Sequence, residues 1–242
     1  MAGTRFPTTR WSRVLAAAGS SPSGRSAMSE LCNRYWYPLY AAVRRKTRDP
    51  ERASDLTQAF FTRFLEKNDV AAADKARGRF RSWMLACLEN FLKNAHDHET
   101  TWKAGGRVRT VSIDEEEAEG RFASLPAEAP PDDALFDGLW AVTAVERAME
   151  TMRARCRDGD ARAFHASVEP LLTLPDTDPG DTAAIASKLS LEPGTFKTRL
   201  SRERARLWGY VRAELAETLD DPNDVDEELK YLISVLGALW RM

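Results

Sequence analysis

Residues 181–202 read DTAAIASKLSLEPGTFKTRLSR, and this pattern predicts two helices separated by a tight turn. Ile185 and Leu189 give the first helix its apolar side. Phe196, Leu200 and Leu207, at steps of four and seven residues, do the same for the second helix. The stretch therefore predicts a helix-turn-helix, a motif whose second helix often lies in the major groove of DNA.

The other side of the second helix is polar and basic. It carries Thr195, Lys197, Thr198, Ser201 and Arg202, which combine cations for phosphates with short donors for base edges. This side fits DNA, and it also fits an ordinary helical hairpin with a solvated basic face. Both interpretations are open on the pattern alone.

Helical periodicity extends through most of the chain. Before the quoted stretch it predicts helices over 11–18, 31–43, 49–66, 80–95, 135–157 and 164–172. The third of these begins at Asp49-Pro50, an N-cap followed by a proline in the first turn. After the quoted stretch, the second helix of the motif continues to about residue 215, and a last helix is expected over 222–239. No long run of alternating β-branched residues is present, so we predict an all-α fold.

The segment 105–134 lacks helical periodicity and is rich in Gly, Glu, Ala and Pro. It contains Asp114-Glu115-Glu116-Glu117 and Pro130-Pro131, a composition typical of a flexible tether. We therefore predict two small helical domains, 1–104 and 135–217, joined by an acidic linker over 105–134. An acidic helical extension follows over 218–242.

Net charge is sorted along the chain. The total is −2, but residues 1–109 hold 20 basic and 10 acidic side chains and residues 181–212 hold 7 and 3. The segments 110–140 and 213–242 are acidic, with net charges of −8 and −6. Two basic modules are thus separated and followed by acidic segments, so the overall charge does not argue against a nucleic-acid partner.

Several function classes lack a candidate site. The chain has no apolar run long enough for a bilayer and no N-terminal signal pattern, so we expect a cytoplasmic protein without a membrane partner. Cys32, Cys87 and Cys156 are expected to be free thiols. His96 and His98 point about 200° apart on a helix and cannot share a metal. We therefore expect no metal, cofactor or catalytic residue; a helical nuclease using these histidines and Asp97 is the nearest enzyme alternative.

Three motifs resemble bacterial extracytoplasmic-function (ECF) sigma factors, members of the sigma-70 family of RNA polymerase subunits. Ile185-Ala186, Leu189 and residues 194–200 (GTFKTRL) are similar to the family's fourth conserved region. Residues 55–63 (DLTQAFFTR), and 80–85 (FRSWML) followed by Asn90, are similar to its second region. The motifs occur in the family's order and cover about 31–99 and 136–212.

The resemblance implies a transcription-initiation factor that binds the β′ and β subunits of core RNA polymerase and melts promoter DNA. Asp55 and Gln58 would contact polymerase. The single-stranded −10 element would be held by Lys75, Arg77, Arg79, Arg81, Asn90, Lys93 and Asn94, and the duplex −35 element by Thr195, Lys197, Thr198, Arg199, Ser201 and Arg202. Trp83 lies on the apolar stripe, where periodicity favours a core role. The chain itself would catalyse no reaction.

The chain departs from the family pattern at four positions. Ala59 stands where family members commonly carry glutamate, and Thr57 stands where valine or isoleucine is usual. Thr57 is therefore a candidate phosphorylation site for a Ser/Thr kinase, because a phosphate would restore negative charge there. Ser190 replaces the usual turn glycine and Glu192 the usual cap serine, so we expect the turn to differ.

The extension over 218–242 has two interpretations. Its helix either completes the core of the second domain, which we favour, or covers the DNA-reading face as an acidic mimic of phosphate. For the whole chain, the alternative function is a stand-alone helix-turn-helix regulator that binds duplex DNA without polymerase.

Overall fold

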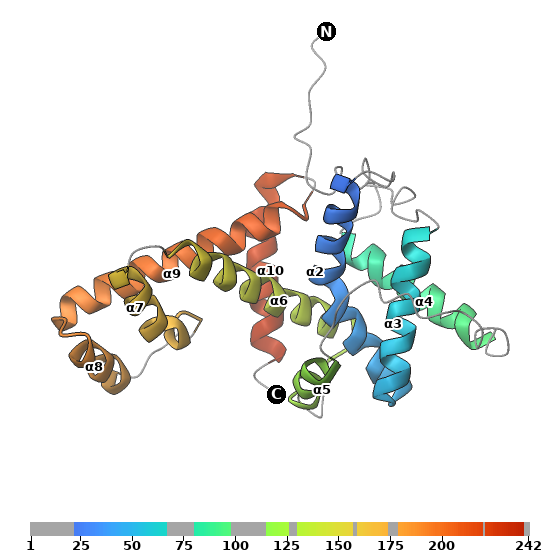
Figure 1. Ribbon diagram of the computed structural model, residues 1–242, viewed down its shortest axis with the longest axis horizontal. Helices are drawn as coiled ribbons and strands as arrows, with labels where there is room; N and C mark the ends of the chain where they lie inside the picture. The colour runs from blue at the N-terminus through green and yellow to red at the C-terminus, as the bar shows by residue number, and fades with distance from the viewer. Residues whose placement is uncertain are drawn as a thin grey trace, which may run out of the picture. The chain divides into compact units, whose positions relative to one another are not determined.

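A computed structural model describes residues 22–66, 80–97, 115–125, 130–156, 159–173, 179–219 and 221–239. Throughout these ranges the regular structure is helical, as the periodicity predicts (Figure 1). None of the described helices combines the length and apolar character needed to cross a membrane. The predicted helix over 11–18 lies outside the described residues.

The chain divides into two compact units. Unit 1 contains residues 1–143 and 216–242, and unit 2 contains residues 144–215. Unit 2 is thus inserted in the chain of unit 1. This division differs from the predicted one, which placed the boundary at residue 134 and kept the C-terminal extension apart.

The first three described helices of unit 1 are α2 (Pro22–Thr47), α3 (Pro50–Glu66) and α4 (Phe80–Asp97). The α3 helix starts as predicted, because the Asp49 carboxylate accepts the backbone N–H of Glu51 at 3.1 Å. Helix α2 packs against α3, and α3 packs against α4. Aromatic residues fill the space between them; the Phe60 ring lies 5.7 Å from that of Phe91.

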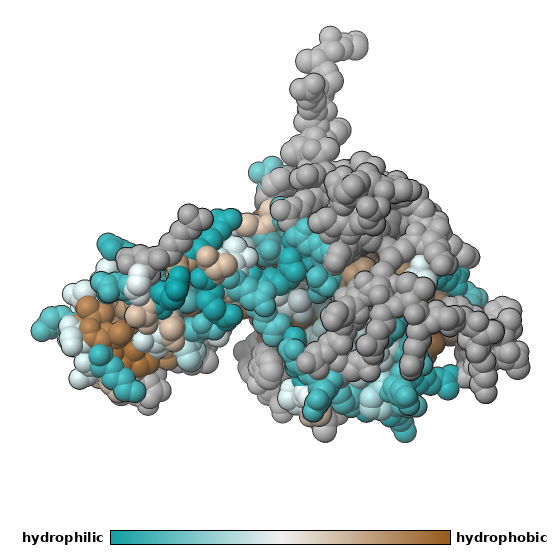
Figure 2. Space-filling view, in the orientation of Figure 1, coloured by the Kyte–Doolittle hydropathy of each residue, from teal (hydrophilic) through white to brown (hydrophobic). Residues whose placement is uncertain are grey.

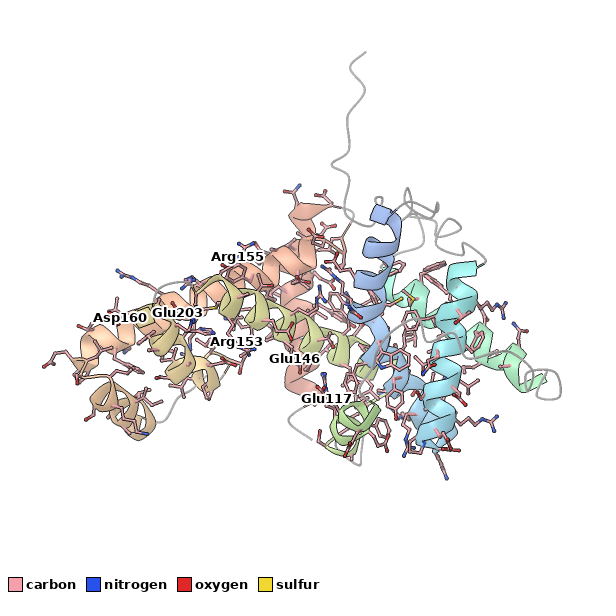
Figure 3. All side chains as sticks on the ribbon, viewed as in Figure 1. Glu117, Glu146, Arg153, Arg155, Asp160 and Glu203 are labelled. Atoms are coloured by element: carbon pink, nitrogen blue, oxygen red, sulfur yellow. The ribbon has the colours of Figure 1, made fainter. Side chains whose placement is uncertain are left out.

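The predicted tether contains a further helix of unit 1, α5 (Glu115–Ala123). Figure 3 labels Glu117 on its exposed side. On the other side Ala118 is buried, and Glu119 receives hydrogen bonds from Arg44 of α2 at 2.8, 3.0 and 3.2 Å. The Tyr40 hydroxyl donates a further one at 2.7 Å. Part of the predicted tether is therefore bound to the first domain.

Two more of the described helices belong to unit 1. The first half of α6 (Asp132–Arg155) buries Leu139 and Trp140 there, with the Trp140 ring 6.3 Å from that of Tyr35. A 3-10 turn, η5 (Pro222–Asp224), leads into α10 (Val225–Leu239), which buries Leu229 and Leu232. The favoured interpretation of the extension, a helix completing the second domain, is therefore not what the structure shows.

Unit 2 is built from the second half of α6 with α7 (Gly159–Val168), η4 (Glu169–Leu171), α8 (Pro179–Lys188) and α9 (Pro193–Ala216). The core residues of α9 are Phe196, Leu200, Leu207, Val211 and Leu215. The Phe164 ring of α7 packs on Phe196 at 6.0 Å. Figure 2 shows apolar residues gathered over the α7–α8 end of the unit in the view drawn.

Candidate nucleic-acid interface

Helices α8 and α9 form the two arms of the predicted helix-turn-helix. Ala186 of α8 is 2% exposed and Phe196 of α9 also 2%, so the small residue and the ring are both in the core of unit 2. Ile185 and Leu189 are half-buried. The predicted apolar sides of the two helices therefore face the interior of unit 2.

The turn between the helices has the conformation that normally favours glycine. Ser190 has a φ of +53°, within the left-handed region. The Leu191 N–H donates to the Ala186 carbonyl at 2.9 Å and the Ser190 N–H to that of Ser187 at 3.0 Å, which caps the end of α8 in the manner of a Schellman motif. The glycine-type turn is thus retained with a serine, whereas the sequence suggested a different turn.

Helix α9 begins directly after this turn. Its first backbone hydrogen bond runs from the Phe196 N–H to the Glu192 carbonyl at 2.9 Å, and Pro193 occupies the first helical position. Glu192 thus serves as the N-cap residue through its backbone, although it is not one of the favoured cap residues.

Five of the six predicted −35 residues are exposed on α9. They are Thr195, Lys197, Thr198, Ser201 and Arg202. The Thr198 hydroxyl donates to the Gly194 carbonyl at 2.9 Å, which leaves its oxygen lone pairs as acceptors. This surface, which we call the α9 face, offers both cations and short polar groups to a ligand.

Arg199 differs from the other predicted −35 residues. It is half-buried, and its guanidinium carbon lies 4.0 Å from the centroid of the Phe164 ring. This stacking contact joins α9 to α7. The Arg199 side chain therefore packs inside unit 2 and is less accessible to DNA than the other five residues.

A layer of charged side chains joins α6, α7, η4 and α9 within unit 2. Buried His165 has its Nε2 3.7 Å from Glu169 and its Nδ1 3.6 Å from Glu203, distances too long for hydrogen bonds. Arg153 pairs with Glu169 at 2.7 Å, and Arg206 pairs with Glu203 at 2.7 Å. Figure 3 labels Arg153 and Glu203 in this layer. No local sequence pattern indicates this layer, because the charged residues come from three segments that meet only in the fold.

In unit 1, three of the predicted −10 residues share one side of α4. Asn90, Lys93 and Asn94 are exposed and follow an i, i+3, i+4 spacing, which places them on one helix face. Lys75, Arg77 and Arg79 lie outside the described residues. Trp83 is half-buried, with its ring 5.8 Å from that of Phe64, so it packs with the core as periodicity favours.

Arg81 must be removed from the predicted DNA-binding set. Its side chain is 3% exposed. The Nε atom donates to the Asp137 carboxylate of α6 at 2.6 Å, and Nη1 donates to Glu228 of α10. The Tyr231 hydroxyl donates to the second oxygen of Asp137 at 2.6 Å. We call these four residues the Arg81 cluster.

The Arg81 cluster holds its charge in an apolar setting. The guanidinium carbon lies 5.1 Å from the centroid of the Trp140 ring and 5.7 Å from that of Tyr231. Burial alone would lower the pKa of Arg81, but the Asp137 and Glu228 carboxylates outweigh it and raise this pKa above its ordinary value. Arg81 thus stays charged and joins α4, α6 and α10.

The predicted polymerase-contacting residues lie on α3. Asp55 is exposed, and Gln58 is half-buried with its amide donating to the Ser54 hydroxyl at 3.3 Å. Thr57 lies between them in sequence but is 0% exposed, and its hydroxyl donates to the Ala53 carbonyl at 2.7 Å. A kinase cannot reach this hydroxyl in the structure, so the prediction of a phosphorylation site at Thr57 is not supported.

The described residues contain no group of three His, Cys, Asp or Glu side chains that could hold a metal ion. The side chains of His96 and Asp97, and all of His98, lie outside them. Cys32 and Cys156 are buried free thiols and Cys87 is half-buried.

Comparison of the chain with models of protein families, with curated proteins and with solved structures finds no match.

Proposed function

We propose that this chain is a sigma factor of the ECF type, which brings core RNA polymerase to promoter DNA. The α9 face carries the proposal. It presents Thr195, Lys197, Ser201 and Arg202 on the second helix of a helix-turn-helix, in a sequence that resembles the family's −35-reading region. Lysine and arginine neutralise phosphates, and the hydroxyls reach base edges.

Unit 1 supports the same proposal through α4. Asn90 and Asn94 offer amides to an unstacked base, and Lys93 offers a cation to the strand that carries it. Exposed Asp55 on α3 supplies an acidic contact for a basic surface of polymerase. Binding both surfaces to one promoter through polymerase would raise the effective concentration of each and so supply affinity that neither needs to have alone.

Under this proposal the chain acts in the cytoplasm and needs neither cofactor nor metal. The bond-forming chemistry of transcription belongs to polymerase, and the chain positions and opens the DNA. Control by phosphorylation of Thr57 is not part of the proposal, because the hydroxyl is fully buried.

Reconstitution tests the proposal. Core polymerase and the full chain are combined on a promoter library, and the transcripts are sequenced to identify start sites. We expect initiation at a defined pair of elements that depends on the added chain. Lys197→Ala should reduce transcription about fivefold at roughly 0.15 M salt, because it removes one cation that neutralises a phosphate. Lys230→Ala, which removes an exposed cation from α10, is the matched control and should leave it unchanged.

Two results would overturn the proposal. Absence of chain-dependent initiation on every template argues against a sigma factor. Tight binding to a palindromic duplex without polymerase, by a dimer of the chain, identifies the stand-alone helix-turn-helix regulator instead.

A further inference from the structure

Within unit 1, helix α5 lies on the C-terminal half of α2 (Figure 1). Tyr37, Tyr40 and Arg44 of α2 follow an i, i+3, i+7 spacing, which places them on one side of that helix. Each of the three contacts a side chain of α5. We call this side of α2, with its two tyrosines and one arginine, the α2 face.

The Glu119 carboxylate of α5 is an anion bound to the α2 face. Arg44 donates to both of its oxygens through Nε, at 3.0 and 3.2 Å, and to one of them through Nη2 at 2.8 Å. The Tyr40 hydroxyl donates to Oε2 at 2.7 Å. Hydrogen bonding from Arg44 lowers the pKa of Glu119 below its ordinary value, so the carboxylate is charged at neutral pH. A forked guanidinium that converges with a hydroxyl on one oxyanion also suits a phosphate.

A second side chain of α5 stacks on the same face. The guanidinium carbon of Arg121 lies 4.0 Å from the centroid of the Tyr37 ring, over its face. An unstacked base of a single strand packs on a tyrosine ring in the same way, because bases and guanidinium groups are both planar. A planar group and an anion, two residues apart on α5, therefore lie where the base and the phosphate of a nucleotide would fit.

The attachment of α5 to this face is slight. Of the α5 side chains that the structure describes, only Ala118 is buried. A helix of nine residues is too short to be stable alone in water. The ion pair between Arg44 and Glu119 is partly exposed, with side-chain exposures of 15% and 32%, so solvent and salt weaken it. Elements with few buried contacts open locally at a low free-energy cost, and α5 meets that description.

We propose that the α2 face is a binding site for single-stranded nucleic acid, and that α5 covers it as an internal competitor. In the open form a base stacks on Tyr37, and Arg44 and Tyr40 hold the neighbouring phosphate. In the closed form Arg121 occupies the position of the base and Glu119 that of the phosphate. Strand binding requires opening of α5, so the apparent affinity of the face is reduced in proportion to the open fraction.

The choice of DNA as the strand rests on the proposed function, because promoter melting would supply single-stranded DNA. The α2 face then adds a contact to those proposed for Asn90, Lys93 and Asn94 on α4. A base that is paired in a duplex cannot stack on Tyr37. Helix α5 therefore stays closed on duplex DNA and opens only when a melted strand competes with it.

Fluorescence anisotropy with a short labelled DNA strand tests the site on the full chain without polymerase. Glu119→Gln removes the charge that Arg44 binds, and Glu116→Gln is the matched control, because it removes an exposed charge from the same helix. We expect Glu119→Gln to bind the strand about tenfold more tightly than the wild type, the factor that corresponds to loss of one charge-assisted hydrogen bond. Glu116→Gln should bind like the wild type. Equal affinities of the two variants overturn the site.

A pair of double variants locates the gain in affinity. Adding Arg44→Gln to Glu119→Gln removes the cation that would hold the phosphate, so the gain should be lost. Adding Lys230→Gln instead removes an exposed cation from α10, and the gain should be kept. Exchange of the α3 amides shows that unit 1 is folded in each variant. If the gain survives Arg44→Gln in a folded chain, the strand binds elsewhere and the site is overturned.

Hydrogen exchange of the wild type tests the competition without any substitution. A saturating single strand should speed exchange of the α5 amides, because it displaces the helix, and a duplex of the same sequence should not. A strand that binds while the α5 amides exchange as slowly as before overturns the competition. Binding of an RNA strand but not of DNA overturns the link to promoter melting. If the chain passes these binding tests but directs no initiation with polymerase, the proposed function fails and the α2 face stands.

Discussion

Thr57 offers a direct test of the burial argument. Thr57→Val removes the hydroxyl's 2.7 Å hydrogen bond to the Ala53 carbonyl. That carbonyl still accepts the helical N–H of residue 57, so no buried acceptor is left without a donor. The expected loss in unfolding free energy is therefore about 0.5–1.5 kcal/mol. Since the residue is 0% exposed, Thr57→Glu instead places an unpaired carboxylate in the core, at a cost of about 3–5 kcal/mol.

The larger cost is a substantial part of the roughly 5–15 kcal/mol that stabilises a typical domain. Exchange of the α3 amides measures it within unit 1, and Ser82→Glu, which adds the same charge at an exposed position of α4, is the control. We expect strong acceleration in Thr57→Glu, a small one in Thr57→Val and none in the control. If Thr57→Glu exchanges like the wild type, the hydroxyl is accessible, and a kinase site at this position becomes tenable again.

Three further predictions concern individual contacts. Ser190→Gly should stabilise unit 2 by about 0.5–1 kcal/mol, because glycine removes the steric cost of a positive φ but loses more chain entropy; slower exchange of the α8 amides would confirm it, and faster exchange would contradict it. Arg199→Lys should lower the unfolding free energy of unit 2 by about 0.5–1 kcal/mol in a urea titration, since lysine lacks the planar group that stacks on Phe164. The control Lys197→Arg should leave that free energy unchanged. The hydrogen bonds from Arg44 lower the pKa of Glu119, so their contribution to stability is present above the ordinary glutamate pKa and is lost as pH falls through the lowered one. Proteolysis within 115–125 should thus increase on acidification, and Glu119→Gln should be cleaved readily at neutral pH.

Local sequence signals predict the helices of this chain well. The pairing of Asp49 with Pro50 predicts the start of α3, and the carboxylate caps the helix there. The apolar steps from Phe196 to Leu207 predict α9, and both residues are buried. These signals succeed because capping and amphipathic burial are decided by residues within a few turns of one another.

Helix α5 shows where local signals fail. Four of its nine residues are acidic, and the segment around it resembles a tether. The helix is held by contacts of Glu119 with Tyr40 and Arg44, which lie 79 and 75 residues earlier in the chain. No local pattern contains those contacts, so the composition indicates a linker where the fold has an attached helix.

The residues of the candidate site also fall into a group that the sequence predicts and a group that only the fold reveals. The exposed residues of the α9 face follow from helical periodicity, since the side opposite an apolar stripe faces solvent. Arg81 also lies in a family-like motif, but periodicity could not reveal that Asp137 and Glu228 would enclose it. Whether a basic residue such as Arg81 remains available to a ligand depends on acidic residues from distant segments. Tertiary packing alone brings those acidic residues beside it.

Acidic residues from other segments neutralise part of the positive charge counted for the N-terminal segment. Residues 1–109 carry a net charge of +10, which suggests a strongly basic surface. In the fold, Arg44 is paired with Glu119, Lys46 with Glu89 and Asp132, and Arg81 with Asp137 and Glu228. Most of these acids come from the acidic linker and the C-terminal helix. The charge left for nucleic acid in the described part of unit 1 is therefore smaller than the count implies. Each phosphate contact steepens the slope of log K against log salt concentration by about 0.9. The net charge counted from the sequence therefore overestimates how strongly DNA binding by this unit weakens as salt is added.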